Sequence, residues 1–226
     1  VKIENVEWVS RAELEKAACC NLSECFETSA SVDVGFTDAI TGAKQIQMLG
    51  LDGVYTQVLF ENMPLLRGLS ASYGLNYLPG SWIESIQIAK GTGSVVSGFE
   101  SLSGQVNVEI YKPQSADKLF WNSYVNSSGL IENNFVLSAP LKSGWKTALL
   151  GHYSSRGKSI DMNGDGFADN PEMSRLTLLN RWEYTGFENR HILFGFRYLS
   201  EGRHSGQISG DDPQTEIFEI FNPYEV

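Results

Sequence analysis

The sequence has no apolar run near the ~20 residues that a membrane-spanning helix requires, and no charged-then-apolar leader at its first residues. We therefore expect no transmembrane helix, and we expect the chain to start as a mature or truncated product. A basic stretch is absent too, since 17 Lys and Arg stand against 27 Asp and Glu for a formal net charge of -10. A nucleic-acid-binding surface needs clustered basic residues, so the composition argues against a nucleic-acid partner.

Catalytic motifs are also missing. The sequence contains no nucleophile elbow, no His-Glu-x-x-His and no kinase signature. The three histidines, His152, His191 and His204, lie far apart and away from the cysteines, so we interpret each as a residue of a polar face and not as a metal ligand. The sequence therefore predicts that the protein is not an enzyme.

Only three cysteines are present, and Cys19, Cys20 and Cys25 lie within seven residues. Neighbouring cysteines rarely pair with each other, so one interpretation is a disulfide from Cys19 or Cys20 to Cys25, with Cys20–Cys25 as the candidate pair. Buried structural thiols are a second interpretation. A metal site is a third, but three thiols with no histidine nearby fall short of the usual four ligands.

Two predicted strands flank a glycine-rich connection between Trp82 and Tyr111. The first is rich in Ile and ends at Gly91, and the second alternates apolar with polar residues from Gln105 to Tyr111. In a dinucleotide-binding loop the third glycine would stand at position 96, but Val96 occupies it and the next glycine is Gly98. We therefore predict tight turns around one short helical turn, in place of a phosphate loop.

This stretch resembles the closing segment of the plug domain of TonB-dependent outer-membrane transporters. In that family a strand of the type Ile-Glu-Arg-Ile-Glu-Val is followed by Lys-Gly, a small-residue turn, and a strand of the type Gly-Gly-Val-Ile-Asn-Ile. The counterparts here are Ile83–Ile88, Lys90-Gly91, Ser97-Gly98 and Ser103–Val108. Ser85 replaces a basic residue and Ser103 replaces the first of two glycines.

Further blocks follow the family's order over residues 1–112. They are Asn21–Glu24 at the start of the plug helix, Ser31–Val34 in the next strand, Ile46–Gly50 for the usual Ile-Arg-Gly, and Val58–Pro64 for a strand running into Asp-Gly-Val-Pro. The substitutions make this a divergent, Bacteroidetes-like version. The resemblance implies an α+β plug domain, a mixed sheet with short helices, at residues 1–112. It implies the first strands of an outer-membrane β-barrel at residues 113–226.

The same resemblance implies a function and a location. The plug would lie inside a barrel of about twenty-two strands in the bacterial outer membrane, in contact with outer-membrane lipid. It would gate the import of a scarce nutrient such as a metal chelate, a siderophore or cobalamin, driven by a TonB-type energy-transducing inner-membrane protein. The long loop Pro64–Gly80 offers Arg67, Tyr73 and Tyr77 as substrate-binding candidates, and a plain surface crossover is the alternative for that loop.

Local signals predict the helices of the N-terminal half. Ser10-Arg11-Ala12-Glu13 is a capping box that predicts a helix from about Arg11 to Ala18. Asn21-Leu22-Ser23-Glu24 repeats the device and predicts a second helix to about Thr28. Strands are expected at Val1–Val9, near Val32, at Gln45–Leu49 and at Thr56–Glu61.

After Lys112-Pro113 the pattern becomes a repeated alternation of period two. The predicted strands are Asp117–Asn126, Asn133–Leu141, Trp145–Ser154, Arg175–Tyr184 and Arg190–Leu199. Each of the last three has an apolar face with aromatic ends and a mixed polar face, which is typical of a lipid-facing barrel wall and also of a soluble β-sandwich. Short connections at one end and long loops at the other favour the barrel.

One long loop matches a calcium-binding pattern. Numbered from its first aspartate, oxygen ligands fall at positions 1, 3, 5, 9 and 12, with glycine at position 6 and a backbone carbonyl at position 7. The candidate ligands are Asp161, Asn163, Asp165, Phe167, Asp169 and Glu172. Strands and not helices enter and leave this loop, so a solvated acidic turn is the alternative, and a bound calcium ion would have a structural role.

The sequence therefore leads to one main hypothesis, that the chain is the plug and the first wall strands of a TonB-dependent transporter. About five strands cannot close such a barrel, so we expect a fragment of a longer protein. The alternative hypothesis is a soluble, secreted two-domain binding module with a calcium-stiffened β-sandwich.

Overall fold

The computed structural model describes residues 6–17, 20–26, 29, 31–38, 43–64, 74–93, 100–164, 166–187 and 190–207. Contacts divide the chain into two units. The first comprises the described parts of Val1–Asp38 and Ala43–Tyr111, and the second those of Lys112–Val226.

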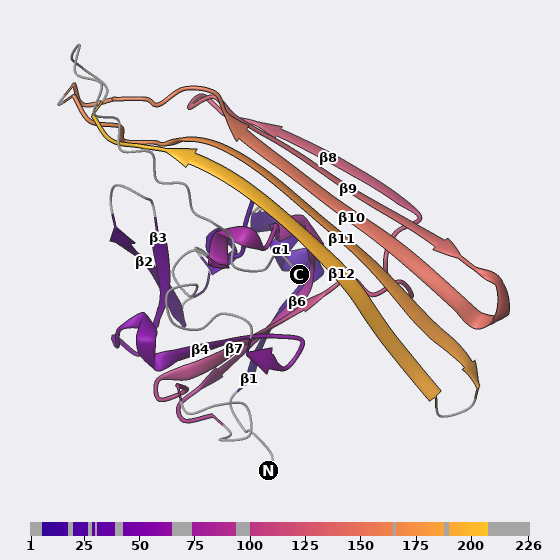
Figure 1. Ribbon diagram of the computed structural model, residues 1–226. Helices are drawn as coiled ribbons and strands as arrows, with labels where there is room; N and C mark the ends of the chain where they lie inside the picture. The colour runs from indigo at the N-terminus through magenta and orange to yellow at the C-terminus, as the bar shows by residue number, and fades with distance from the viewer. Residues whose placement is uncertain are drawn as a thin grey trace. The chain divides into compact units, whose positions relative to one another are not determined.

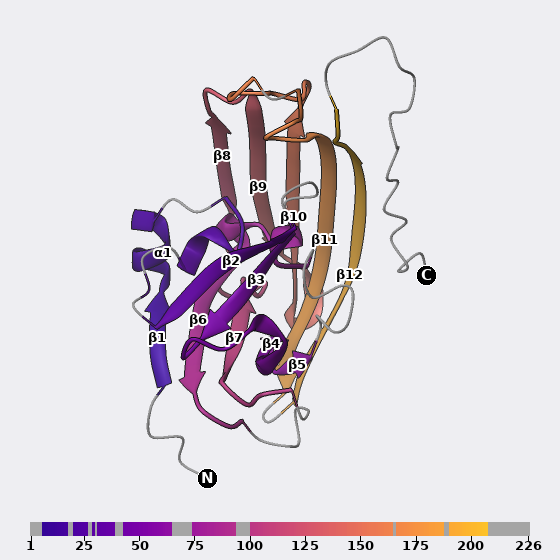
Figure 2. The same cartoon turned by 90° about the vertical axis from the view of Figure 1, so that its left-hand side faces the viewer.

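The first unit is built on a five-stranded mixed sheet with the order β1-β6-β7-β4-β5 (Figure 2). Its strands are β1 (Val6–Ser10), β4 (Thr56–Phe60), β5 (Met63–Pro64), β6 (Ile83–Lys90) and β7 (Gly104–Ile110). Strands β4 and β7 pair in parallel, and all other neighbours are antiparallel. The two strands predicted on either side of the glycine-rich connection are confirmed as antiparallel neighbours, although residues 94–99 of the connection lie outside the described part.

One face of β6 and β7 forms the centre of the core. The pairs Ile86↔Val108 and Ile88↔Val106 lie side by side, and all four side chains are at most 1% exposed. Burying a side chain of this size contributes roughly 1.5–3 kcal/mol, so this row is a main source of the unit's stability. The opposite face is polar, and there the amide of Asn107 donates to Gln87 Oε1 at 3.5 Å.

Helix α1 (Arg11–Ala17) begins at the predicted capping box. The backbone amide of Ser10 donates to Glu13 Oε2 at 2.7 Å, and the Ser10 hydroxyl donates to the same oxygen at 2.8 Å. These two hydrogen bonds, the backbone one first, lower the pKa of Glu13 below its ordinary value because they favour the ionised carboxylate. Leu14 is buried, and the guanidinium of Arg11 lies 5.0 Å from the ring centre of Tyr111, which ties the helix to the residue after β7.

The second predicted helix, Asn21 to Thr28, is wrong. The segment forms only the short 3-10 helix η1 (Glu24–Phe26), and residues 27 and 28 lie outside the described part. The backbone amide of Leu22 donates to the carbonyl of Leu78 at 2.9 Å, which ties this segment to the chain just before η4. The Glu24 carboxylate accepts from the Cys20 amide at 2.9 Å, which shows that a capping-type contact can form without a longer helix.

A two-stranded antiparallel hairpin, β2 (Val32–Asp38) and β3 (Ala43–Met48), completes the first unit together with three short 3-10 helices. These helices are η2 (Gly53–Tyr55), η3 (Leu75–Tyr77) and η4 (Gly80–Trp82). Met48 is 1% exposed, and a Cβ atom added at Gly104 would lie 2.5 Å from its Sδ and Cε atoms. Glycine at this position of β7 therefore leaves the space into which the hairpin packs.

The second unit is one long, curved antiparallel sheet with the order β12-β11-β10-β9-β8 (Figure 1). Its strands are β8 (Leu119–Val125), β9 (Leu130–Pro140), β10 (Trp145–Arg156), β11 (Glu172–Phe187) and β12 (Arg190–His204), with the 3-10 turn η5 (Lys142–Gly144) before β10. All five predicted strands are confirmed, but β11 and β12 run to 16 and 15 residues, longer than the alternation alone indicated.

The connectivity of this sheet contradicts the β-sandwich alternative. Every strand pairs with the strand that precedes or follows it in sequence. Over residues 112–164, 166–187 and 190–207 the unit has this one sheet and no second sheet packed on it, whereas a sandwich requires two. Among the described residues, no helix has the length and apolar character needed to cross a membrane.

Candidate functional site: the two faces of the strand wall and a cavity in the first unit

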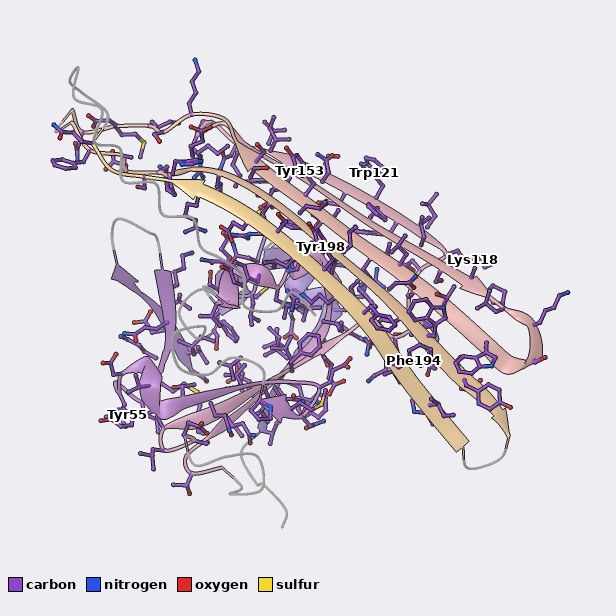
Figure 3. All side chains as sticks on the ribbon, in the orientation of Figure 1. Tyr55, Lys118, Trp121, Tyr153, Phe194 and Tyr198 are labelled. Atoms are coloured by element: carbon purple, nitrogen blue, oxygen red, sulfur yellow. The ribbon has the colours of Figure 1, made fainter. Side chains whose placement is uncertain are left out.

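One face of the sheet in the second unit is apolar and rich in aromatic side chains, and we call it the outward face. The opposite face of the same strands is called the inward face. The strand register puts Trp145, Tyr184 and Ile192 in one row, and the next row contains Trp182 and Phe194. The ring centres of Trp145 and Tyr184 lie 5.0 Å apart, and those of Trp182 and Phe194 lie 5.3 Å apart. Figure 3 shows Phe194 and Tyr198 along β12, Tyr153 on β10 and Trp121 on β8.

The outward face exposes many large apolar side chains, which is unfavourable in contact with water. Phe194, Phe196 and Tyr198 are 45%, 72% and 54% exposed, and large apolar side chains of β8 are exposed as well. A continuous exposed apolar surface of this kind marks contact with a membrane or a partner. On β10 the apolar row runs from Trp145 to Tyr153, eight residues or about 26 Å at ~3.3 Å each. A strand tilt of about 40° reduces that to about 20 Å, close to the ~25 Å band of an outer-membrane barrel.

The inward face of the same strands carries buried charge. The Glu201 carboxylate lies between two guanidinium groups, 3.2 Å from Arg175 Nη2 and 2.8 Å from Arg203 Nη2. The three side chains are 3%, 5% and 8% exposed. A buried carboxylate is stable only when it is paired in this way, and removing one partner of such a group typically costs about 3–5 kcal/mol.

Hydrogen bonds extend this cluster across the sheet towards the long-loop end of β9 and β10. The Ser154 hydroxyl donates to Glu132 Oε1 at 3.1 Å, and His152 Nδ1 lies 2.7 Å from Asn134 Oδ1. Arg156 Nη1 donates to the Pro171 carbonyl at 3.3 Å. The sequence analysis did not predict that these residues contact one another. A signal was present, because polar residues alternate with apolar ones near the loop ends of neighbouring strands, and such alternation indicates a shared polar face.

A second polar group lies at the opposite end of the inward face. The Glu183 carboxylate accepts from the backbone amide of Gln114 at 2.9 Å and lies 2.7 Å from His191 Nε2. Lys146 Nζ donates to Gln114 Oε1 at 2.8 Å. These contacts attach the segment before β8 to two strands of the sheet, β10 and β11. The prediction that His152 and His191 belong to a polar face is confirmed by their strand register, and His204 is exposed at the end of β12.

The predicted substrate-binding residues are placed only in part. Arg67 and Tyr73 lie outside the described residues, and Tyr77 is half-buried at the end of η3. Their role stays a prediction.

The predicted calcium loop is described except for Asp165. The Asp161 carboxylate accepts from the backbone amides of Gly164 and Gly166 at 2.6 and 2.9 Å. The Asp169 carboxylate accepts from the Met162 amide at 2.6 Å. The loop therefore curls around its own carboxylates. In the part of the chain that the structure describes, no three His, Cys, Asp or Glu side chains form a group that could hold a metal ion.

The interpretation that Cys25 forms a disulfide is confirmed, but the candidate pair Cys20–Cys25 is not the one that forms. Cys25 is disulfide-bonded, but Cys20 carries a thiol. The backbone of Cys20 is held from two sides, because its amide donates to Glu24 and its carbonyl accepts from the Gly80 amide at 3.0 Å. Cys19 lies outside the described residues.

A cavity of about 740 Å³ lies in the first unit, and sequence reasoning did not predict it. Buried Phe26 and Val32 contribute apolar lining, and Leu49 and Gly50 after β3 also line it. Two lysines, Lys44 on β3 and Lys90 at the end of β6, contribute positive charge. These residues are separated by up to 64 positions, which is why no local pattern indicates the cavity.

Comparisons with known proteins agree with this architecture. Residues 3–105 match the model of the TonB-dependent receptor plug domain. The fold resembles the siderophore receptor PirA from Acinetobacter baumannii (20% identity, TM-score 0.70), covering 88% of this chain and 32% of that one. It also resembles the siderophore receptor PiuA from Acinetobacter baumannii (14% identity, TM-score 0.71; 89% and 27% covered). A third similar structure is FpvA of P. aeruginosa bound to heterologous pyoverdines (14% identity, TM-score 0.72; 92% and 26% covered).

Together these findings define a class, an α+β plug followed by the first antiparallel strands of a barrel wall that is not closed. Residues 3–105 match the TonB-dependent receptor plug family, and the chain as a whole has the fold of the corresponding part of these receptors. The chain spans about a third or less of the length of the similar receptors.

Proposed function

We propose that this chain is the plug and first wall strands of an active transporter that binds and imports a scarce nutrient carried as a metal chelate of the siderophore type. The observation that carries the proposal is the match of residues 3–105 to the plug family. The similar structures named as siderophore receptors support the substrate class.

The two faces of the strand wall fit this role. An outward face of Trp, Tyr and Phe suits contact with lipid chains, and an inward face of paired Arg and Glu suits a hydrated interior. A water-soluble chelate could not cross the bilayer along the apolar face. It would need the polar face and movement of the plug, which a TonB-type inner-membrane protein would drive.

Arg67, Tyr73 and Tyr77 remain our candidates for substrate contact. A guanidinium group donates several hydrogen bonds in a fixed plane and suits an anionic chelate, and tyrosine provides a ring with a hydroxyl donor. Calcium at the 161–172 loop remains a proposal for a structural ion. It is supported by the spacing of the oxygen ligands and by the turn in which the Asp161 carboxylate caps two backbone amides.

Uptake by whole cells tests the proposal. A strain that lacks the complete gene is supplied in turn with radiolabelled ferric siderophores and cobalamin, alongside the parent strain and a strain without its TonB-type protein. We expect both mutant strains to lose uptake of the same compound, and Arg67→Ala to reduce that uptake. If every compound in the panel enters all three strains equally, the proposed function is wrong.

A further inference from the structure

Arg156, the last residue of β10, is buried without an acidic partner. It is 8% exposed, yet no carboxylate oxygen of the described residues lies within ion-pair distance of its guanidinium group. Arginine is almost never buried in this way unless it is paired, because a charge held away from water without a counter-charge is costly. The position of this side chain therefore calls for a negatively charged group.

The hydrogen bonds of the same guanidinium group are few and long. Nη1 donates to the Pro171 carbonyl at 3.3 Å and Nη2 to the Ser128 hydroxyl oxygen at 3.4 Å, beyond the usual range of about 2.7–3.2 Å. The Nε atom is buried and has no hydrogen-bond partner among the described residues. A guanidinium group carries several N–H donors in one plane, so Arg156 has donors left for a planar acceptor.

The charges around Arg156 do not compensate it. Strand pairing puts Arg156 and Arg203 in one row of the inward face, and the neighbouring row contains Arg175 with the carboxylates of Glu132 and Glu201. Glu201 is already shared by Arg175 and Arg203. Glu132 attracts Arg156 less strongly than Arg203 repels it. Three guanidinium groups thus stand against two carboxylates, which leaves one positive charge in excess.

We propose that Arg156 binds a small, water-soluble oxyanion, a carboxylate or a phosphate, on the inward face at the long-loop end of the wall. The fork formed by Nε and a terminal nitrogen matches two oxygens of one such group. The positive charge of Arg203 in the same row favours the anion further. The anion balances the charge of the two rows, and the site does not depend on which nutrient the transporter carries.

Calorimetry on the complete receptor in detergent micelles tests the site. The probes are sodium phosphate and sodium acetate, and sodium chloride at equal ionic strength is the reference. We expect at least one of the two oxyanions to bind, and the one that binds more tightly identifies the chemistry of the ligand.

Variants of Arg156 identify the place of binding. Arg156→Gln should weaken binding of the tighter oxyanion at least about tenfold, because the charge-assisted hydrogen bonds are lost. Arg156→Lys keeps the charge without the planar fork, so it should bind more weakly than the wild type and more tightly than Arg156→Gln. Lys158→Gln removes a positive charge from an exposed position nearby and should bind as the wild type does. Circular dichroism confirms that each variant folds.

Urea unfolding provides a second measurement. An anion that binds only the folded receptor stabilises it, so the tighter oxyanion should raise the unfolding midpoint of the wild type more than that of Arg156→Gln. The proposal is overturned if neither oxyanion binds the wild-type receptor, or if Arg156→Gln binds it as tightly and is stabilised by it to the same extent. None of these measurements involves transport, so they are independent of the uptake experiment above.

Discussion

Phe196 lies where a charge should harm the protein most if the outward face contacts lipid. It is in register with Asn180 on β11 and through it with Leu149 on β10, midway between Trp145 and Tyr153. Its side chain is 72% exposed. In water, replacing so exposed a residue usually changes stability by no more than about 0.5 kcal/mol. At the midplane of a bilayer an arginine on the lipid face costs roughly 2–4 kcal/mol. We therefore expect Phe196→Arg to lower the folding constant about 30- to 1,000-fold.

The assay is reversible urea unfolding of the complete receptor from phospholipid vesicles, followed by tryptophan fluorescence. Phe196→Leu measures the loss of the edge contact with Trp182, whose ring centre is 6.1 Å away, and should cost about 0.5–1.5 kcal/mol beyond the lost area. Ile192→Arg places the same charge at the rim, in the row of Trp145 and Tyr184, and should cost only about 0–1 kcal/mol. Equal costs for Phe196→Arg and Ile192→Arg would refute a lipid-facing wall with this register.

Three further predictions follow from local geometry. A Cβ atom at Gly151 would lie 2.1 Å from the Phe135 ring, so Gly151→Ala should lower the free energy of unfolding by roughly 1–3 kcal/mol in the same urea assay. Adding Phe135→Leu should recover part of the loss. The control Gly157→Ala, at a position with open space around it, should leave the stability unchanged. Because the pKa of Glu13 is lowered in the folded state, its contribution to stability is present above the unfolded pKa of about 4.3 and is lost as the pH falls through the lower, folded pKa. Glu13→Gln should flatten this part of the stability profile in pH-dependent unfolding, and an unchanged profile would contradict the capping role. For the 161–172 loop we expect terbium luminescence that calcium competes away and that Asp165→Ala weakens; no luminescence would exclude the ion site.

Where the fold could be read from the sequence, a short-range pattern was enough. The period of two in Trp145–Ser154 gave β10 and its two faces, because each side of a strand is defined by alternate residues and a slip of one residue would reverse them. The capping box at Ser10 and Glu13 gave the start of α1 for a similar reason, since both partners lie within one turn. The order of plug motifs from Ile46 to Val108 gave the class.

What the sequence did not predict depends on distant partners. The segment after Asn21 has a helical signal but forms only η1 within its described part, and its Leu22 amide and Cys20 carbonyl pair with Leu78 and Gly80, more than fifty residues away. The cavity is lined by residues of β2, β3 and the end of β6, which are far apart in the sequence, so no local sequence pattern predicts it.

Asn180 shows why composition alone does not decide whether a face can contact lipid. It is a polar residue in the middle row of the outward face, where an unsatisfied amide would cost roughly 1–3 kcal/mol. The Thr147 hydroxyl lies 3.0 Å from Asn180 Oδ1 and also 3.0 Å from the Arg181 carbonyl. The single hydroxyl hydrogen of the neighbouring strand is shared between these two acceptors, and the one on Asn180 is a side-chain oxygen of the outward face. Because the Asn180 side-chain oxygen has a hydrogen-bond donor within the sheet, this polar residue costs less in an apolar medium than its composition suggests. Thr147→Val, which keeps the shape and removes the hydroxyl, should therefore destabilise the receptor more in vesicles than an exposed apolar exchange at the same depth.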